Sequence, residues 1–175
     1  MRIAPYSSVL ALAFSSAILA WVGVGWSHAD ELAGSLPPAE KLQAEAPKSP
    51  IPAAAIMEPE ELARVLASPA HDKPLVLQVG FRFLYKEAHI PGAEYIGPAS
   101  KEDGIRQLRQ RVASLPRTKP IVIYCGCCPW IRCPNVKPAF DALRELGFKQ
   151  VKVLRIDDNF GTNWVAKGYT TAKGE

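Results

Sequence analysis

The chain has 175 residues, of which 48% are hydrophobic, so its length and composition suit one domain with a packed core. Its net charge of +4 is a mild excess and gives no indication of nucleic-acid binding. Many of the 16 prolines lie between Pro37 and Pro74, which indicates an extended segment ahead of the core rather than a disordered protein.

Residues 1–29 have the features of an export signal. Arg2 supplies positive charge, residues 9–24 are largely apolar, and small residues precede a cleavage point after Ala29. We therefore expect a periplasmic or extracellular protein. The alternative is an uncleaved segment that anchors the protein in a membrane, because the apolar stretch approaches spanning length. No cysteine in or just after this segment is available for lipid attachment.

Residues 30–55 are rich in Pro, Ala, Glu and Lys, and they are expected to form a linker because they bury too little apolar surface to fold. The folded domain is expected over residues 56–175. Its first helix begins at Pro59, with apolar residues at helical spacing at Leu62, Val65 and Leu66.

A buried strand is predicted over residues 75–79, ended by Gly80. The alternating aromatic residues that follow, Phe81, Phe83 and Tyr85, are expected to pack inside the protein. Next comes a helix capped by Asp103, with an inward face and a solvated face. The inward residues are Ile105, Leu108 and Val112, and the solvated ones are Arg106, Arg109 and Arg111.

The most strand-like segment, residues 121–124, leads directly into Cys125. Asn135 is expected to cap the next helix, which Gly147 ends; its inward residues are Val136, Ala139, Phe140, Leu143 and Leu146. A strand over 151–154 and a short helix from Trp164 to Tyr169, ending at Gly168, complete the chain. Strands that alternate with helices predict an α/β fold with a parallel sheet.

All four cysteines lie within nine residues, between the predicted strand over 121–124 and the next helix, at Cys125, Cys127, Cys128 and Cys133. In a parallel α/β sheet, ligands bind beyond the carboxyl ends of the strands, where a helix N-terminus favours negative charge. The same field lowers the pKa of a thiol, so Cys125 is the candidate nucleophile.

Four landmarks, in order over roughly residues 56–172, resemble those of rhodanese-like domains. Ala88-His89-Ile90-Pro91-Gly92-Ala93 is similar to the family's Gly-His-Ile-Pro-Gly-Ala, and Tyr124-Cys125 is similar to its strand-end Tyr-Cys. The other two landmarks are Leu146-Gly147-Phe148 and Trp164 with Gly168-Tyr169. The resemblance implies a three-layer fold, with a central parallel sheet of about five strands and helices on both faces. It also implies a cysteine, here Cys125, that carries sulfane sulfur as a persulfide, and it places His89 in a structural turn.

The sequence departs from that family in two places. The frequent Asp-x-Arg after the first core strand is replaced by Gln78-Val79-Gly80. In the loop, which usually resembles Cys-x-x-Gly-x-Arg, Cys128 replaces the glycine and Arg132 follows Cys125 by seven residues instead of five. No cysteine stands six positions before Arg132, which argues against the Cys-x5-Arg phosphatases that share this fold.

The expected function is an exported sulfurtransferase or persulfide carrier. Its partners would be a small sulfur-donor anion and a thiol or other thiophilic acceptor, with no cofactor, no metal and no nucleic acid. Gly126, Arg132 and Trp130 are candidates for substrate binding, although Trp130 equally fits a core position and Arg132 a surface one.

Two alternatives stay open. In a thiol-disulfide oxidoreductase, Cys125 would work with Cys128 at Cys-x-x-Cys spacing, or with Cys127 or Cys133. A non-enzymatic module would bind a metal or a partner through the loop. Adjacent Cys127 and Cys128 rarely suit one tetrahedral ion, which weakens the metal alternative.

Overall fold

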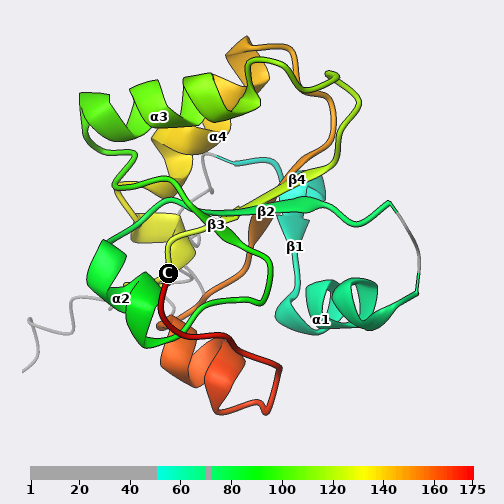
Figure 1. Ribbon diagram of the computed structural model, residues 1–175, viewed down its shortest axis with the longest axis vertical. Helices are drawn as coiled ribbons and strands as arrows, with labels where there is room; N and C mark the ends of the chain where they lie inside the picture. Colours follow the sequence, from blue (N-terminus) through cyan, green and yellow to red (C-terminus); the bar gives the residue numbers. More distant parts are fainter. Residues whose placement is uncertain (1–50, 70–71) are drawn as a thin grey trace, which may run out of the picture. The chain divides into compact units, whose positions relative to one another are not determined.

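The computed structural model describes residues 51–69 and 72–175 (Figure 1). The predicted signal and most of the predicted linker lie outside the described residues. The described chain contains a five-stranded sheet in the order β1-β5-β4-β2-β3, in which every neighbouring pair is parallel. The strands are β1 (Ile56–Met57), β2 (Leu75–Gln78), β3 (Glu94–Tyr95), β4 (Ile121–Tyr124) and β5 (Val151–Leu154). The predicted α/β fold with about five parallel strands is therefore confirmed.

The centre of the sheet is β4, which lies between β2 and β5. Its side chains are buried on both faces, as a continuous apolar run in a parallel sheet predicts. The three four-residue strands were all predicted from such runs. The two-residue strands β1 and β3 were not, because so short a segment shows no periodicity.

Helices cover both faces of the sheet (Figure 1). They are α1 (Pro59–Ala67), α2 (Arg82–Glu87), α3 (Glu102–Val112) and α4 (Val136–Glu145), with short turns η2 (Ala53–Ala55), η3 (Trp130–Arg132) and η4 (Gly161–Val165). One core cluster joins α3 and α4 to one face of the sheet through Leu108 and Leu143. A second cluster on the other face joins α1, α2 and η4 through Leu62, Tyr85 and Trp164.

Three local predictions were wrong. Lys101, not Asp103, is the N-cap residue of α3, and Asp103 forms an ion pair with Arg106 in the first turn. The last helical turn, η4, is a π-helix that begins and ends earlier than expected. At its start, Asn159 Oδ1 accepts a hydrogen bond from the backbone N–H of Thr162 at 2.9 Å.

The third error concerns the aromatic residues after β2. All three were expected to pack inside the protein, but residues 82–87 form helix α2. Only Tyr85 is buried, whereas Phe81 is 43% exposed and Phe83 is 67% exposed. In a helix, residues two positions apart point to different sides, so the three side chains cannot share one buried face.

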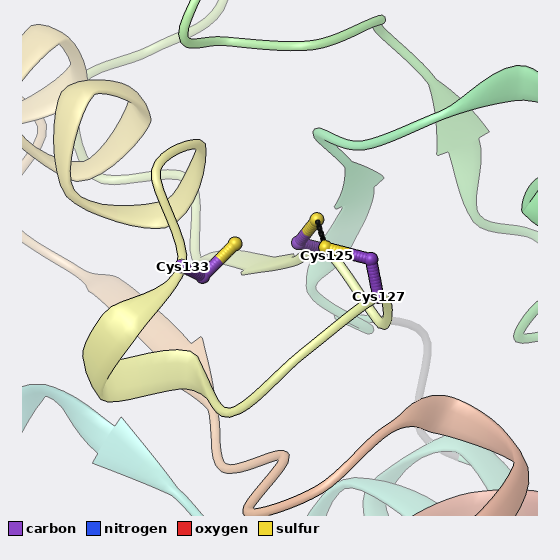
Figure 2. Close-up of side chains that lie close together, drawn as sticks. All are labelled: Cys125, Cys127 and Cys133. Carbon is purple, nitrogen blue, oxygen red and sulfur yellow. Dashed lines mark hydrogen bonds between the residues drawn. The ribbon is translucent and has the colours of Figure 1, made fainter.

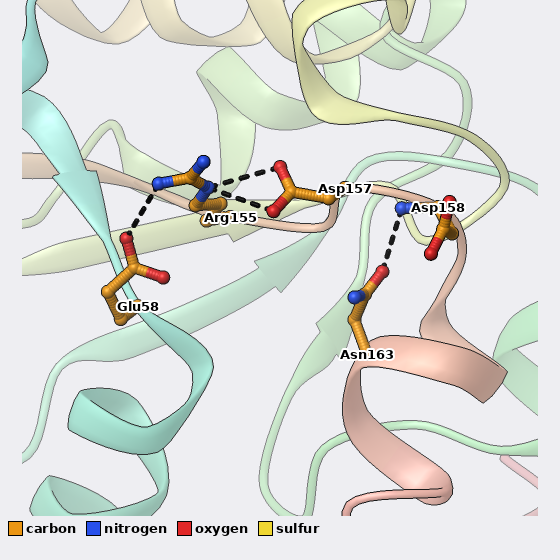
Figure 3. A network of polar contacts seen from close by, with 5 residues as sticks. All are labelled: Glu58, Arg155, Asp157, Asp158 and Asn163. Carbon is orange, nitrogen blue, oxygen red and sulfur yellow. Dashed lines mark hydrogen bonds and ion pairs between the residues drawn. The ribbon is translucent and has the colours of Figure 1, made fainter.

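A polar network fixes the loop that follows β5 (Figure 3). Arg155 pairs with Glu58, just before α1, at 3.2 Å and with Asp157 at 3.0 Å. The backbone N–H of Asp158 donates to Asn163 Oδ1 at 2.8 Å. These exposed pairs add little stability, but together they set the path of the chain toward η4.

Within the described residues, none of the helices is long and apolar enough to cross a membrane.

Candidate functional site

Strand β4 delivers Cys125 to the carboxyl edge of the sheet, where the chain turns sharply. The backbone carbonyl of Tyr124 still accepts the N–H of Val79 at 2.8 Å, so the sheet ends immediately before the cysteine. Gly126 then adopts a φ of +82°, and a Cβ there would lie 3.0 Å from Phe160 Cβ. A glycine is required at this turn because both the backbone conformation and the space exclude a side chain.

The sulfur of Cys125 lies next to a thiol and a side-chain amide, both of which can donate hydrogen bonds to it. Its side chain is 2% exposed, its Sγ is 3.2 Å from Cys127 Sγ, and Asn135 Nδ2 donates to it at 3.4 Å. Figure 2 shows Cys133 directing its sulfur toward this pair from the opposite limb of the loop. The loop thus folds back so that three cysteine sulfurs meet within 4.8 Å of one another.

These contacts favour the ionised form of the Cys125 thiol. Its pKa is lowered to about 6, first by a hydrogen bond from Cys133 and then by the backbone N–H and thiol of Cys127 and by Asn135, against the opposing effect of burial. The hydrogen bond to Cys125 and burial raise the pKa of Cys133; burial and the neighbouring thiols raise that of Cys127. The expected nucleophile is therefore the thiolate of the cluster at neutral pH, and its neighbours are thiol donors.

Two residues that sequence reasoning did not assign to the site lie beneath it. Gln78 is buried, its Nε2 donates to the carbonyl of Cys125 at 3.0 Å, and its Oε1 accepts the N–H of Gly80 at 3.1 Å. A Cβ on Gly80 would lie 2.7 Å from Cys125 Sγ. The replacement of the family's Asp-x-Arg by Gln78-Val79-Gly80 was the sequence signal that could have indicated these two residues. Gln78 supports the backbone at Cys125, and Gly80 leaves room for the Cys125 sulfur.

Asn135 occupies the predicted N-cap position of α4, but its side chain makes no capping hydrogen bond. Instead it spans two loops: Oδ1 accepts the backbone N–H of Ser100 at 3.0 Å while Nδ2 donates to Cys125. It is completely buried. Asn135 is thus a site residue whose position was predicted and whose role was missed.

The other residues that the sequence predicted for the site, Cys128, Trp130 and Arg132, make no hydrogen bond to Cys125 within the described residues. Cys128 Sγ contacts Cys127 Sγ at 3.1 Å and, within the described residues, makes no hydrogen bond to Cys125. Trp130 is partly buried against the core, as the packing alternative expected. The Arg132 side chain is exposed, and within residues 51–69 and 72–175 it is not among the groups that lower the pKa of Cys125.

His89 confirms its predicted structural role. It is buried, its Nδ1 lies 2.8 Å from the carbonyl of Tyr85, and its ring stacks on that of Tyr85 at 3.9 Å. Its backbone pairs with Ala172, which ties the end of the described chain to this turn. Through these contacts the residue orients a turn.

Cys127 also borders a cavity of about 510 Å³ between α2 and η4. The lining includes Leu84, Gly126, Cys127, Phe160, Val165 and Lys173. A largely apolar cavity of this size is typical of sites for small molecules. Among the loop cysteines, Cys127 therefore has a distinctive position, since it contacts Cys125 and faces this space.

The spacing of the sulfurs of Cys125, Cys127 and Cys133 would also allow them to surround one soft metal ion. The expectation that the site holds no metal stays a prediction.

Several solved structures are similar to this chain. The Alr3790 protein from Anabaena sp. has a TM-score of 0.52 and 22% identity, with 67% of this chain and 82% of that chain covered. The BH2092 protein from Bacillus halodurans has a TM-score of 0.52 and 24% identity, with 67% and 76% covered. Thiosulfate sulfurtransferase from Pseudomonas aeruginosa has a TM-score of 0.50 and 26% identity over 69% of this chain but only 19% of its own.

None of the curated proteins compared with the chain matches it. The family model of the rhodanese-like domain matches residues 58–156, which is more than half of the chain. The matched range contains β2, β3, β4 and β5 but not β1. Together with the parallel five-stranded sheet and the cysteine at the end of β4, this match shows that the chain belongs to the rhodanese-like domain family.

Proposed function

We propose that the protein is a sulfurtransferase in which Cys125 accepts sulfane sulfur as a persulfide. The observation that carries the proposal is the position of Cys125 at the end of the central strand, where its sulfur lies 3.2 Å from Cys127 Sγ and accepts a hydrogen bond from Asn135 Nδ2 at 3.4 Å, contacts that favour its thiolate form. A thiolate in such a setting is a strong nucleophile at neutral pH without an adjacent base.

With thiosulfate as donor, the Cys125 thiolate attacks the outer sulfur. A new S–S bond forms at Cys125, the S–S bond of thiosulfate breaks, and sulfite leaves with the bonding electron pair. No oxidant or reductant is consumed. The persulfide then passes its outer sulfur to a thiol. The likeness to thiosulfate sulfurtransferase from Pseudomonas aeruginosa supports this class of donor.

A second candidate is a thiol-disulfide oxidoreductase, favoured by the 3.2 Å between the sulfurs of Cys125 and Cys127. Mass spectrometry after thiosulfate treatment distinguishes the two. Gain of one sulfur atom, abolished in Cys125→Ser, is the result expected of a sulfurtransferase. Reversible loss of two hydrogens with no gained sulfur would contradict the proposal and favour the oxidoreductase. Stoichiometric metal in the untreated protein would contradict both.

We further propose that this chemistry takes place outside the cytoplasm. The support is the sequence of residues 1–29, with its basic start, apolar run and small residues before Asp30.

A further inference from the structure

We propose that Cys127 is a second sulfur carrier, which takes the sulfane sulfur from Cys125 and presents it in the cavity between α2 and η4 to a low-molecular-weight thiol. This inference rests on the proposed function and names the route by which the sulfur leaves.

The positions of the two cysteines support a relay. Cys125 is 2% exposed and enclosed by Gly80, Asn135 and the other loop thiols, so its sulfur is much less accessible to an acceptor thiol than that of the half-buried Cys127. Cys127 is only half-buried, contacts Cys125 at 3.2 Å and lines the cavity of about 510 Å³. Cys133 is also near Cys125, but it is buried and does not border this cavity.

The transfer step is balanced. Cys127 gives its proton to solvent water and attacks the outer sulfur of the Cys125 persulfide; the new S–S bond forms at Cys127 while the bond to Cys125 breaks. Cys125 keeps the electron pair as a thiolate. The step starts with one persulfide and one thiol and ends with one persulfide, one thiolate and the proton released to water, so no oxidant or reductant is needed. Each S–S bond is about 2.05 Å long, and an in-line transfer needs the two cysteine sulfurs about 4 Å apart. Cys127 therefore turns outward, toward the cavity that it already lines.

The direction of transfer follows from the leaving group. Thiol exchange is faster and more favourable when the departing sulfur is the better stabilised thiolate. Cys125 is that thiolate, because Cys133, Asn135 and the backbone N–H of Cys127 stabilise its charge, whereas the pKa of Cys127 is raised. Sulfur is therefore expected to move from Cys125 to Cys127.

The acceptor is expected to be a small thiol because the cavity has the volume of a small-molecule site. Its lining is largely apolar, with one acidic and one basic side chain, Glu87 and Lys173. Glutathione is the probe, since it carries a thiol together with both signs of charge.

The test uses the full chain treated with labelled thiosulfate, alkylated and digested, with the label located by fragmentation of the peptide that contains residues 120–132. Label on both Cys125 and Cys127 is expected in the wild-type protein. Cys127→Ser is expected to retain the label on Cys125, since serine still donates a hydrogen bond, while discharge to glutathione falls by about tenfold or more.

Ile131→Ala is the matched control, because Ile131 is an exposed residue of the same loop and is not part of the cavity lining. It is expected to keep both labels and the wild-type discharge rate. Label on Cys125 but never on Cys127, unchanged discharge in Cys127→Ser, or label reaching Cys127 in Cys125→Ser would each overturn the relay and leave the proposed function intact. Absence of label from Cys125 in the wild-type protein would instead overturn the proposed function.

Discussion

At the scale of single residues, the reactivity of Cys125 depends on hydrogen bonds that no local pattern reveals. Its place at the end of a strand followed from the apolar run 121–124 and the family landmarks. The contribution of Gln78 did not, because this residue lies 47 positions away in the sequence and meets Cys125 only when β2 and β4 pair. The lengthened loop likewise gave no sign that thiols, and not Arg132, would stabilise the charge.

The pH dependence of persulfide formation follows from the lowered pKa of Cys125. A group with a pKa of about 6 is protonated and unreactive below that value and is a thiolate above it. The rate of sulfur gain from thiosulfate is therefore expected to rise through pH 6 and to be nearly constant above neutrality. Stopped-flow or quenched mass spectrometry across this range measures the midpoint. A midpoint near the ordinary thiol value of 9.0 would contradict the assignment.

The variant Asn135→Ala tests how much the hydrogen bond from the Asn135 amide contributes to the lowered pKa of Cys125. The substitution removes the N–H that reaches Cys125 Sγ and leaves the backbone N–H of Ser100 without its acceptor. The midpoint of the pH profile is expected to move upward, and the free energy of unfolding to fall by about 1–3 kcal/mol. Lys137→Ala, an exposed change in the first turn of the same helix, is the control and should alter neither. An unchanged midpoint in Asn135→Ala would show that this amide does not stabilise the thiolate.

At the scale of elements, length decided what the sequence could predict. The four-residue strands and the amphipathic helices α1, α3 and α4 each repeat their pattern often enough to be recognised. Helix α2 has six residues and its exposed Phe83 breaks the helical pattern, so the helix was not predicted. This error matters for function, since α2 forms one wall of the cavity beside Cys127.

The packing of α4 against the sheet supports the site, because this helix begins immediately after Asn135. Leu143→Ala removes a completely buried side chain and is expected to lower the free energy of unfolding by about 2–5 kcal/mol. Leu146→Ala, at the half-buried end of the same helix, is the control and should cost less. Urea denaturation followed by circular dichroism gives both values. Equal losses would mean that α4 is not anchored through Leu143.

At the scale of the whole molecule, the alternation of strands and helices was enough to predict a parallel sheet covered on both faces. The separation into two core clusters follows from it, since alternate side chains of β2 and β4 point to opposite faces. Leu77 and Ile123 face α3 and α4, whereas Val76 and Val122 face α1 and α2.

Export is a prediction about the whole chain. When the full sequence is expressed in a bacterium, we expect a mature form in the periplasm or medium whose first residue is Asp30. Cell fractionation and N-terminal sequencing measure this. A variant with Arg2→Glu and a charged residue within the apolar run should stay in the cytoplasm at full length. Membrane-bound, unprocessed protein would support the anchored alternative, and cytoplasmic wild-type protein would contradict both.

The central place of β4 has a consequence for hydrogen exchange. Its amides bond to strands on both edges, so Ile121–Tyr124 are expected to take up deuterium only in the largest opening events of the protein. The loop that covers Cys125 is attached to its surroundings by isolated bonds, such as those from Phe160 to Gly126 and from Trp130 to Ile156. Its amides should exchange in smaller, more frequent openings. The nucleophile would thus be exposed to solvent by fluctuations of its cover alone, while the strand that carries it stays protected.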